Sequence, residues 1–154
     1  MDHFRPDQAF SEISEKSEFR RNSDKKCVID QYENYDDPSF GKNLNGTTTA
    51  AENVADLLGT TAIWNAYNDL NAEEKEIYIV GLEDYSSDKL FFHIRAAQMC
   101  SVFDTRSLES RLKLNHGVTS FRVNGVYANM ESFAKTFQCP TGSPMNPVQK
   151  CKMF

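Results

Sequence analysis

Residues 48–70 read TTAAENVADLLGTTAIWNAYNDL, and their apolar side chains recur at helical spacing. The recurring residues are Val54, Leu57, Leu58, Thr61, Trp64, Ala66 and Tyr67. Hydroxyl side chains at Thr47 to Thr49 stand where N-cap residues are expected. The stretch therefore predicts a long amphipathic helix from about Thr48 to Leu70.

Further helices are expected on the C-terminal side of this stretch. The apolar spacing predicts them over about 73–79, 86–100, 105–114 and 132–137, while residues 121–127 fit a helix or a strand. Pro140, Gly142, Pro144 and Pro147 predict an irregular tail over 139–151. The fold class is therefore mainly α.

The N-terminal part is more polar. Residues 1–26 are expected to be weakly ordered or to form a short helix over 6–19, and residues 27–154 to form one domain. Residues 27–32 read as a short strand, and residues 34–46 as a loop that holds the glycosylation sequon Asn45-Gly46-Thr47.

Composition excludes several classes of function. The 154 residues carry 17 Lys and Arg against 22 Asp and Glu, so we expect no nucleic-acid partner, which would need a basic face. No apolar stretch is long enough for a membrane span, and the first residues lack the apolar core of a signal peptide. The four cysteines have no CxxC spacing, so they are either disulfide-bonded, with three pairings open, or buried thiols.

Two pairs of polar residues are candidates for chemistry. Glu52 and Asp56 lie four residues apart on one face of the predicted helix, where they either interact with the helix dipole or bind a metal and orient another ligand. His116 stands in a Gly-bounded turn six residues before Arg122, and the two either stay exposed or together bind a carbonyl oxygen, a carboxylate or a developing oxyanion. Histidine ligands for a catalytic zinc are scarce in this sequence. There are only three histidines and no H-E-x-x-H motif, and His93 is expected to be a partly buried core residue.

Five ordered motifs from about Cys27 to Phe154 resemble the neprilysin and endothelin-converting-enzyme family of zinc endopeptidases. Leu44-Asn45-Gly46 precedes Glu52-Asn53-Val54-Ala55-Asp56, which resembles the family's E-N-(I/V)-A-D helix. The family's Q-L-F-F…A-Q-x-W-C helix is matched by residues Asp88 to Phe92 together with Ala97 to Cys100. Its H-x5-R-(V/I)-x-G stretch is matched by His116, Arg122, Val123 and Gly125. The ending is similar too, with Phe133, Phe137, Cys139, Met145-Asn146-Pro147 and Cys151.

The resemblance implies a role for each matching residue. Glu52 matches the family's third zinc ligand, and Asp56 the aspartate that holds a zinc-ligating histidine. His116 matches the histidine that stabilises the oxyanion, and Arg122 the arginine that anchors substrate. It also implies a Cys27–Cys151 disulfide, with Cys100 and Cys139 left as thiols. The implied fold is the C-terminal portion of a neprilysin-like, thermolysin-related catalytic domain.

The chain also departs from the family pattern. It lacks the H-E-x-x-H motif that supplies two zinc ligands and the general base, and Leu57-Leu58-Gly59 stands where the family has Asn-Gly-Gly. We therefore expect a truncated chain that hydrolyses no peptide alone and binds zinc poorly. The family is membrane-anchored or secreted, with its catalytic domain outside the cell, and takes peptide substrates.

Two alternatives to the peptidase remain. The first alternative is a non-catalytic remnant that binds peptides, proteins or a full-length relative. The second is a helical protein with an unrelated role. If the chain is one part of a larger catalytic region, it should expose apolar surface where the missing part would pack. The candidates for this surface are Trp64, Phe91, Phe92 and Phe121.

Overall fold

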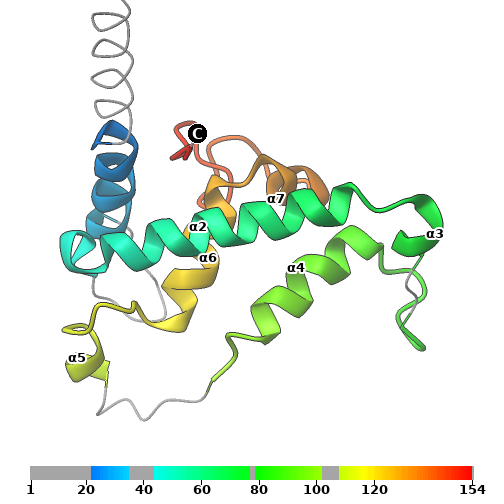
Figure 1. Ribbon diagram of the computed structural model, residues 1–154, viewed down its shortest axis with the longest axis horizontal. Helices are drawn as coiled ribbons and strands as arrows, with labels where there is room; N and C mark the ends of the chain where they lie inside the picture. Colours follow the sequence, from blue (N-terminus) through cyan, green and yellow to red (C-terminus); the bar gives the residue numbers. More distant parts are fainter. Residues whose placement is uncertain (1–21, 35–43, 77–78, 102–107, 154) are drawn as a thin grey trace, which may run out of the picture.

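The computed structural model describes residues 22–34, 44–76, 79–101 and 108–153, and these are mainly helical (Figure 1). Residues 22–34 are helical, and the later helices are α2 (Gly46–Asn68), α3 (Ala72–Lys75), α4 (Ser87–Ala97), α5 (Leu108–Arg111), α6 (Thr119–Asn129) and α7 (Glu131–Thr136). The described ranges contain no strand, only an isolated bridge between Ser143 and Asn146. The prediction of a mainly α fold is confirmed. Within the same ranges, every helix is too short or too polar to cross a membrane.

Helix α2 is the long helix that the sequence predicts, but it begins earlier. Its N-cap is Asn45, whose side chain accepts a hydrogen bond from the Thr48 amide, so the expectation of a threonine cap is wrong. An Asn side chain caps a helix at least as well as Thr, and here it places the first turn at Gly46.

Residues 27–32 are helical, so the predicted strand is wrong. Val28 and Tyr32 are four residues apart and both are buried, which is the pattern of a helix face. A short apolar run does not distinguish a strand from a buried helix, and this explains the error. The domain boundary expected at residue 26 falls inside these helical residues, and the helix expected over 6–19 lies outside the described ranges.

Helices α3, α4, α5 and α7 lie in the stretches for which the sequence predicted further helices. The helices predicted near 73–79, 86–100 and 132–137 are present as α3, α4 and α7, and the ambiguous stretch 121–127 lies in α6. Of the helix expected over 105–114, residues 108–111 form α5, and residues 102–107 lie outside the described ranges. Residues 139–153 form the irregular tail.

The core is built from aromatic residues of several helices. Phe92 of α4 stacks on Trp64 of α2 and makes edge contacts with Tyr127 of α6 and Phe133 of α7. The Tyr127 hydroxyl donates a hydrogen bond to the Phe92 carbonyl over 2.7 Å, and burial raises the pKa of Tyr127 to about 12. These contacts attach α4 and α7 to the pair formed by α2 and α6.

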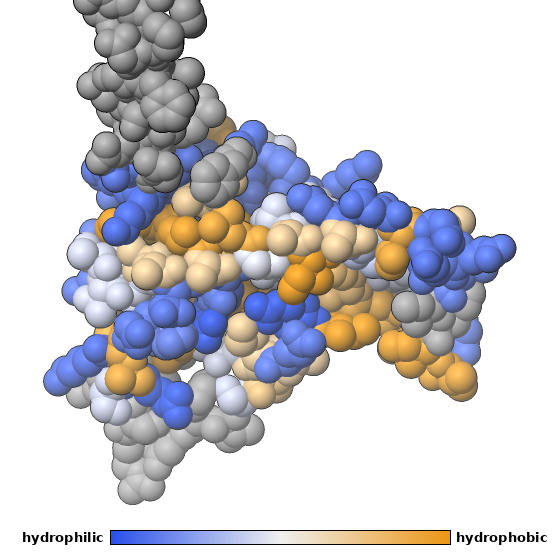
Figure 2. Space-filling view, viewed as in Figure 1, coloured by the Kyte–Doolittle hydropathy of each residue, from blue (hydrophilic) through white to orange (hydrophobic). Residues whose placement is uncertain are grey.

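The expected exposed aromatic face is only partly present. Phe92 and Phe121 are fully buried, which contradicts the expectation, whereas Trp64 and Phe91 are half-buried. Other apolar side chains are exposed instead: Ile63, Leu70, Ile79, Val80, Leu82, Ile94, Leu114 and Val148. Figure 2 shows hydrophobic surface at the end of the molecule where α3 and the following loop lie.

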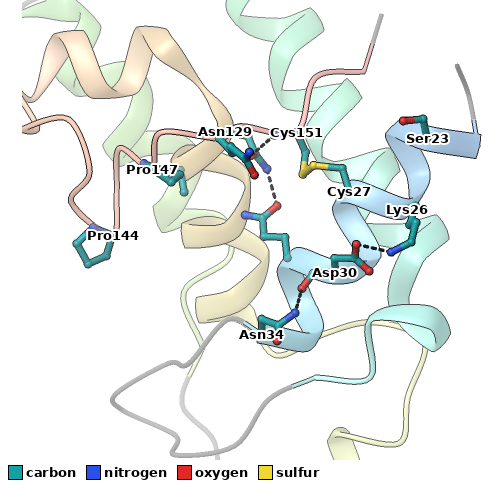
Figure 3. A pocket seen from close by; sticks show the side chains of 12 residues that line it. Ser23, Lys26, Cys27, Asp30, Asn34, Asn129, Pro144, Pro147 and Cys151 are labelled. Carbon is teal, nitrogen blue, oxygen red and sulfur yellow. Dashed lines mark hydrogen bonds and ion pairs between the residues drawn. A yellow bond between two sulfur atoms is a disulfide. The ribbon is translucent and has the colours of Figure 1, made fainter.

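A disulfide joins Cys27 to Cys151, the pairing that the family resemblance implies, while Cys100 and Cys139 are free thiols. The tail is also held by Asn129 of α6, whose side-chain oxygen accepts a hydrogen bond from the Cys151 amide (Figure 3). In a loop-entropy model, a bond closing a loop this long contributes about 4 to 5 kcal/mol. The disulfide therefore fixes the helical residues 22–34 against the end of α6.

Gly125 allows α6 to approach the helical residues 22–34. A Cβ atom at Gly125 would lie 2.4 Å from the hydroxyl oxygen of the buried Tyr32. The Gln31 side chain donates a hydrogen bond to the Gly125 carbonyl at the same contact. Close packing here requires a residue without a side chain.

We predict that Gly125→Ala destabilises the protein by about 1 to 3 kcal/mol, because the new methyl group overlaps the buried Tyr32 ring. Gly59→Ala is the matched control: Gly59 lies in α2 with no atom within 4 Å of the added Cβ. The control should stabilise the helix by up to about 1 kcal/mol. Urea denaturation of both variants measures the difference, and equal effects would contradict the packing assigned to Gly125.

Candidate functional site

Glu52 and Asp56 lie at the edge of the buried face of α2. The buried residues of this helix are Gly46, Thr49, Ala50, Asn53, Leu57 and Thr60, and each acid directly precedes one of them. This position leaves both carboxylates only partly exposed. The first turn of α2 contains no acidic residue, so the helix-dipole interpretation of the pair does not apply.

Asp56 forms a bidentate ion pair with Arg122 of α6. The Arg122 Nε atom donates to Asp56 Oδ2 over 2.6 Å, and Nη2 donates to Oδ1 over 2.7 Å. The two side chains are 11% and 21% exposed, respectively, so Arg122 is not the exposed surface arginine of the alternative interpretation. The hydrogen bonds that Arg122 donates to Asp56 raise the pKa of Arg122, against the opposing effect of burial, and the nearby charge of Glu52 raises it further.

Glu52 lies against His116, which is in the turn before α6. The His116 Nε2 atom is 3.0 Å from Glu52 Oε2, and Nδ1 is 3.2 Å from Asn115 Oδ1. The His116 side chain is 50% exposed and that of Glu52 33% exposed. This second pair is therefore accessible to solvent, in contrast to the Asp56–Arg122 pair.

The structure brings all four sequence-predicted side chains together as two pairs that bridge α2 and the α6 region. Glu52 and Asp56 are one helical turn apart, so the two pairs lie next to each other. The result is a cluster with two carboxylates, an imidazole and a guanidinium, which we call the α2–α6 cluster. Such a group can bind a cation through its carboxylates and an oxygen of a bound molecule through its N–H groups.

The α2–α6 cluster does not supply the full ligand set of a catalytic zinc. Such a site takes three protein ligands and keeps a fourth position open. In the described ranges, no group of three or more His, Cys, Asp or Glu side chains is placed to hold a metal ion. Glu52 alone does not fit a catalytic zinc, so the described residues form at most one part of such a site.

A ladder of polar side chains on α2 was not identified from the sequence. The Asn53 Nδ2 atom donates to Thr49 Oγ1 over 2.8 Å, and Thr49 Oγ1 donates to the Asn45 carbonyl over 2.9 Å. Asn53 is 1% exposed, and its Oδ1 atom has no hydrogen bond from any described residue. Polar residues at intervals of four, at 45, 49 and 53, are the signal that indicates this ladder. It links successive turns along the buried face of α2.

Two other features lie outside the α2–α6 cluster. His93 is exposed rather than partly buried, and it contacts the hydroxyl of Tyr85. A cavity of about 600 Å³ lies beside the disulfide, between the helical residues 22–34 and the tail (Figure 3). It is lined by Ser23, Lys26, Cys27, Asp30, Gln31, Asn34, Ala128, Asn129, Pro144, Pro147, Gln149 and Cys151, and so by none of the four cluster residues.

We predict that neutralising the two acids of the α2–α6 cluster destabilises the protein to different extents. Asp56→Asn should destabilise the protein by about 3 kcal/mol, because it leaves the largely buried Arg122 without its charge partner. Glu52→Gln, the same chemical change one turn away, should cost less than about 1 kcal/mol, because its pair with His116 is solvent-accessible. Chemical denaturation at neutral pH compares them, and equal losses would show that burial does not distinguish the pairs.

Comparison with known proteins identifies the family. The model of peptidase family M13 matches residues 7–153. Neprilysin-2 of Drosophila melanogaster is 40% identical over 131 residues, an endothelin-converting enzyme homolog of Locusta migratoria 37% over 131, and human endothelin-converting enzyme 1 36% over 140. These matches cover 84%, 84% and 88% of this chain but only 17%, 18% and 17% of the relatives. The chain belongs to peptidase family M13.

Proposed function

We propose that this chain provides the C-terminal part of the active site of a neprilysin-like zinc metalloendopeptidase. The observation that carries the proposal is the α2–α6 cluster, in which Glu52 pairs with His116 and Asp56 with Arg122. The family is one of zinc peptidases that act on peptides, and the chain spans less than a fifth of its relatives. The other residues needed for catalysis would come from outside the 154 residues.

Arg122 is proposed to bind the peptide substrate. An arginine has five N–H donors in a fixed fork, and the pair with Asp56 uses two of them. The remaining N–H groups can donate to a backbone carbonyl of the substrate, while Asp56 keeps the guanidinium from rotating. Arg122 thus offers a preorganised oxygen-binding group, which is what substrate positioning requires.

His116 is proposed to stabilise negative charge on the substrate oxygen. Its ring is half-exposed in the turn before α6, so a bound peptide can reach it. An imidazole N–H donates to a developing oxyanion, and a preformed donor of this kind lowers the barrier of acyl transfer. Glu52 contacts the ring at Nε2 and Asn115 contacts it at Nδ1, and together they orient the imidazole.

Glu52 is proposed as one zinc ligand, and Asp56 as the carboxylate that orients a histidine ligand. Asp56 accepts two hydrogen bonds from Arg122, and a carboxylate has about four acceptor positions, so capacity remains for a histidine N–H. A carboxylate that orients a metal-bound histidine contributes about 10- to 100-fold in metal affinity or activity. Because Glu52 does not make a zinc site alone, we expect the isolated chain to be inactive.

A chimera tests these roles. We would replace the matching 131 residues of Drosophila Neprilysin-2 with those of this chain and measure cleavage of a quenched fluorescent peptide. The chimera should be active, Glu52→Gln should abolish activity, and Asp56→Asn should lower it about 10- to 100-fold. Glu131→Gln, at an exposed position on α7, is the matched control and should leave activity unchanged.

Two results would contradict the proposal. One is full activity of the Glu52→Gln chimera, which would remove Glu52 from the metal site. The other is chelator-sensitive cleavage by the pure 154-residue chain, since this would mean that no further ligands are needed. A folded, secreted chimera without activity would favour the non-catalytic alternative, a module that binds peptides or proteins.

A further inference from the structure

Asn45-Gly46-Thr47 is the only N-x-(S/T) sequence in the 154 residues, and the α2–α6 cluster does not use it. Asn-x-Thr with a residue other than proline in the middle is the acceptor sequence for N-linked glycans. The sequence lies where α2 begins, beside the helical residues 22–34 (Figure 1). A Cβ atom at Gly46 would lie 2.1 Å from the Ile29 carbonyl oxygen, so the backbone here is tightly packed while the Asn45 side chain is exposed.

The two polar atoms of the Asn45 side chain have different surroundings. Oδ1 accepts a hydrogen bond from the Thr48 amide over 2.8 Å and caps α2. Nδ2 takes no part in this cap. A sugar attached to Nδ2 leaves Oδ1 an amide oxygen, so the N-cap of α2 is retained after modification.

The disulfide gives an independent indication that the chain matures where glycans are added. Cys27 and Cys151 are bonded, and Cys151 is 6% exposed within the core. Buried structural disulfides are formed and kept in oxidising compartments such as the lumen of the endoplasmic reticulum. The enzymes that glycosylate N-x-(S/T) sequences act in the same lumen.

We propose that Asn45 carries an N-linked glycan. The donor is a lipid-pyrophosphate-linked oligosaccharide: the anomeric C–O bond to the pyrophosphate breaks, a C–N bond to Asn45 Nδ2 forms, Nδ2 loses one proton, and the lipid pyrophosphate leaves. Nothing is oxidised or reduced. Transfer precedes the folding of α2, because in the folded chain Thr47 lies in the first turn and its hydroxyl donates to Glu33.

The glycan has a consequence for the surface around it. Leu44, the residue before Asn45, packs against Gly117, with its Cδ1 atom 2.7 Å from the Cβ position of that glycine, and Gly117 follows His116. The glycan therefore stands at the N-terminal end of α2, near the turn that holds His116. The glycan would cover the surface around Asn45, which is exposed in this chain.

The test uses the full chain behind a cleavable signal peptide, translated with endoplasmic-reticulum microsomes, and scores only protease-protected product. The wild type should show a single upward gel shift that a peptide N-glycosidase removes, leaving Asp at position 45 by peptide mass spectrometry. Asn45→Asp and Thr47→Ala should lose the shift, and Thr47→Ser should keep it. Asn45→Asp is the sharper variant, because aspartate caps a helix as well as asparagine does and folding is preserved.

Protected wild-type chain that contains the Cys27–Cys151 bond but shows no shift would overturn the proposal, since the chain would then have matured in the lumen unmodified. A shift that persists in Asn45→Asp would overturn it as well, because the sugar would be on another residue. Mapping of non-reduced peptides establishes the disulfide in the same samples.

Discussion

The bidentate bond between Asp56 and Arg122 is the interaction on which the candidate site depends. It joins residues 66 positions apart in the sequence and fixes the rotation of α6 against α2. Once this pair is formed, Glu52 one turn earlier on α2 and His116 in the turn before α6 are within contact distance. The cost of burying the two charges is offset by two short, charge-assisted hydrogen bonds. The pair thus couples the packing of the fold to the geometry of the α2–α6 cluster.

Helical spacing made much of this fold predictable. Residues 48–70 indicated α2 because their apolar period is long and unbroken, and the apolar spacing over 86–100 indicated α4. Residues 27–32 were misread because a stretch this short, with Val28, Ile29 and Tyr32 as its large apolar residues, fits both a strand and a helix face. The burial of Phe92 was not predictable, since it depends on contacts with Tyr127 and Phe133, which are distant in sequence.

Sequence spacing made the four site residues candidates, and the family resemblance gave each of them a role. Spacing placed Glu52 and Asp56 on one helix face, but it did not pair them with residues more than 60 positions away. The partner of Arg122 became apparent only in three dimensions, as did the hydrogen bond between Thr49 and Asn53 on the buried face of α2. The family membership and the α2–α6 cluster support the same proposal: a peptidase active site whose remaining metal ligands lie beyond these 154 residues.

A double-mutant cycle on Asp56 and Arg122 tests the central claim most directly. The free energy of unfolding would be measured for the wild type, Asp56→Asn, Arg122→Gln and the double variant. If the pair holds α2 to α6, the double variant should be less destabilised than the sum of the single variants, with a coupling of about 2 kcal/mol. Additivity within about 0.5 kcal/mol would mean that the two side chains are adjacent without holding the site together.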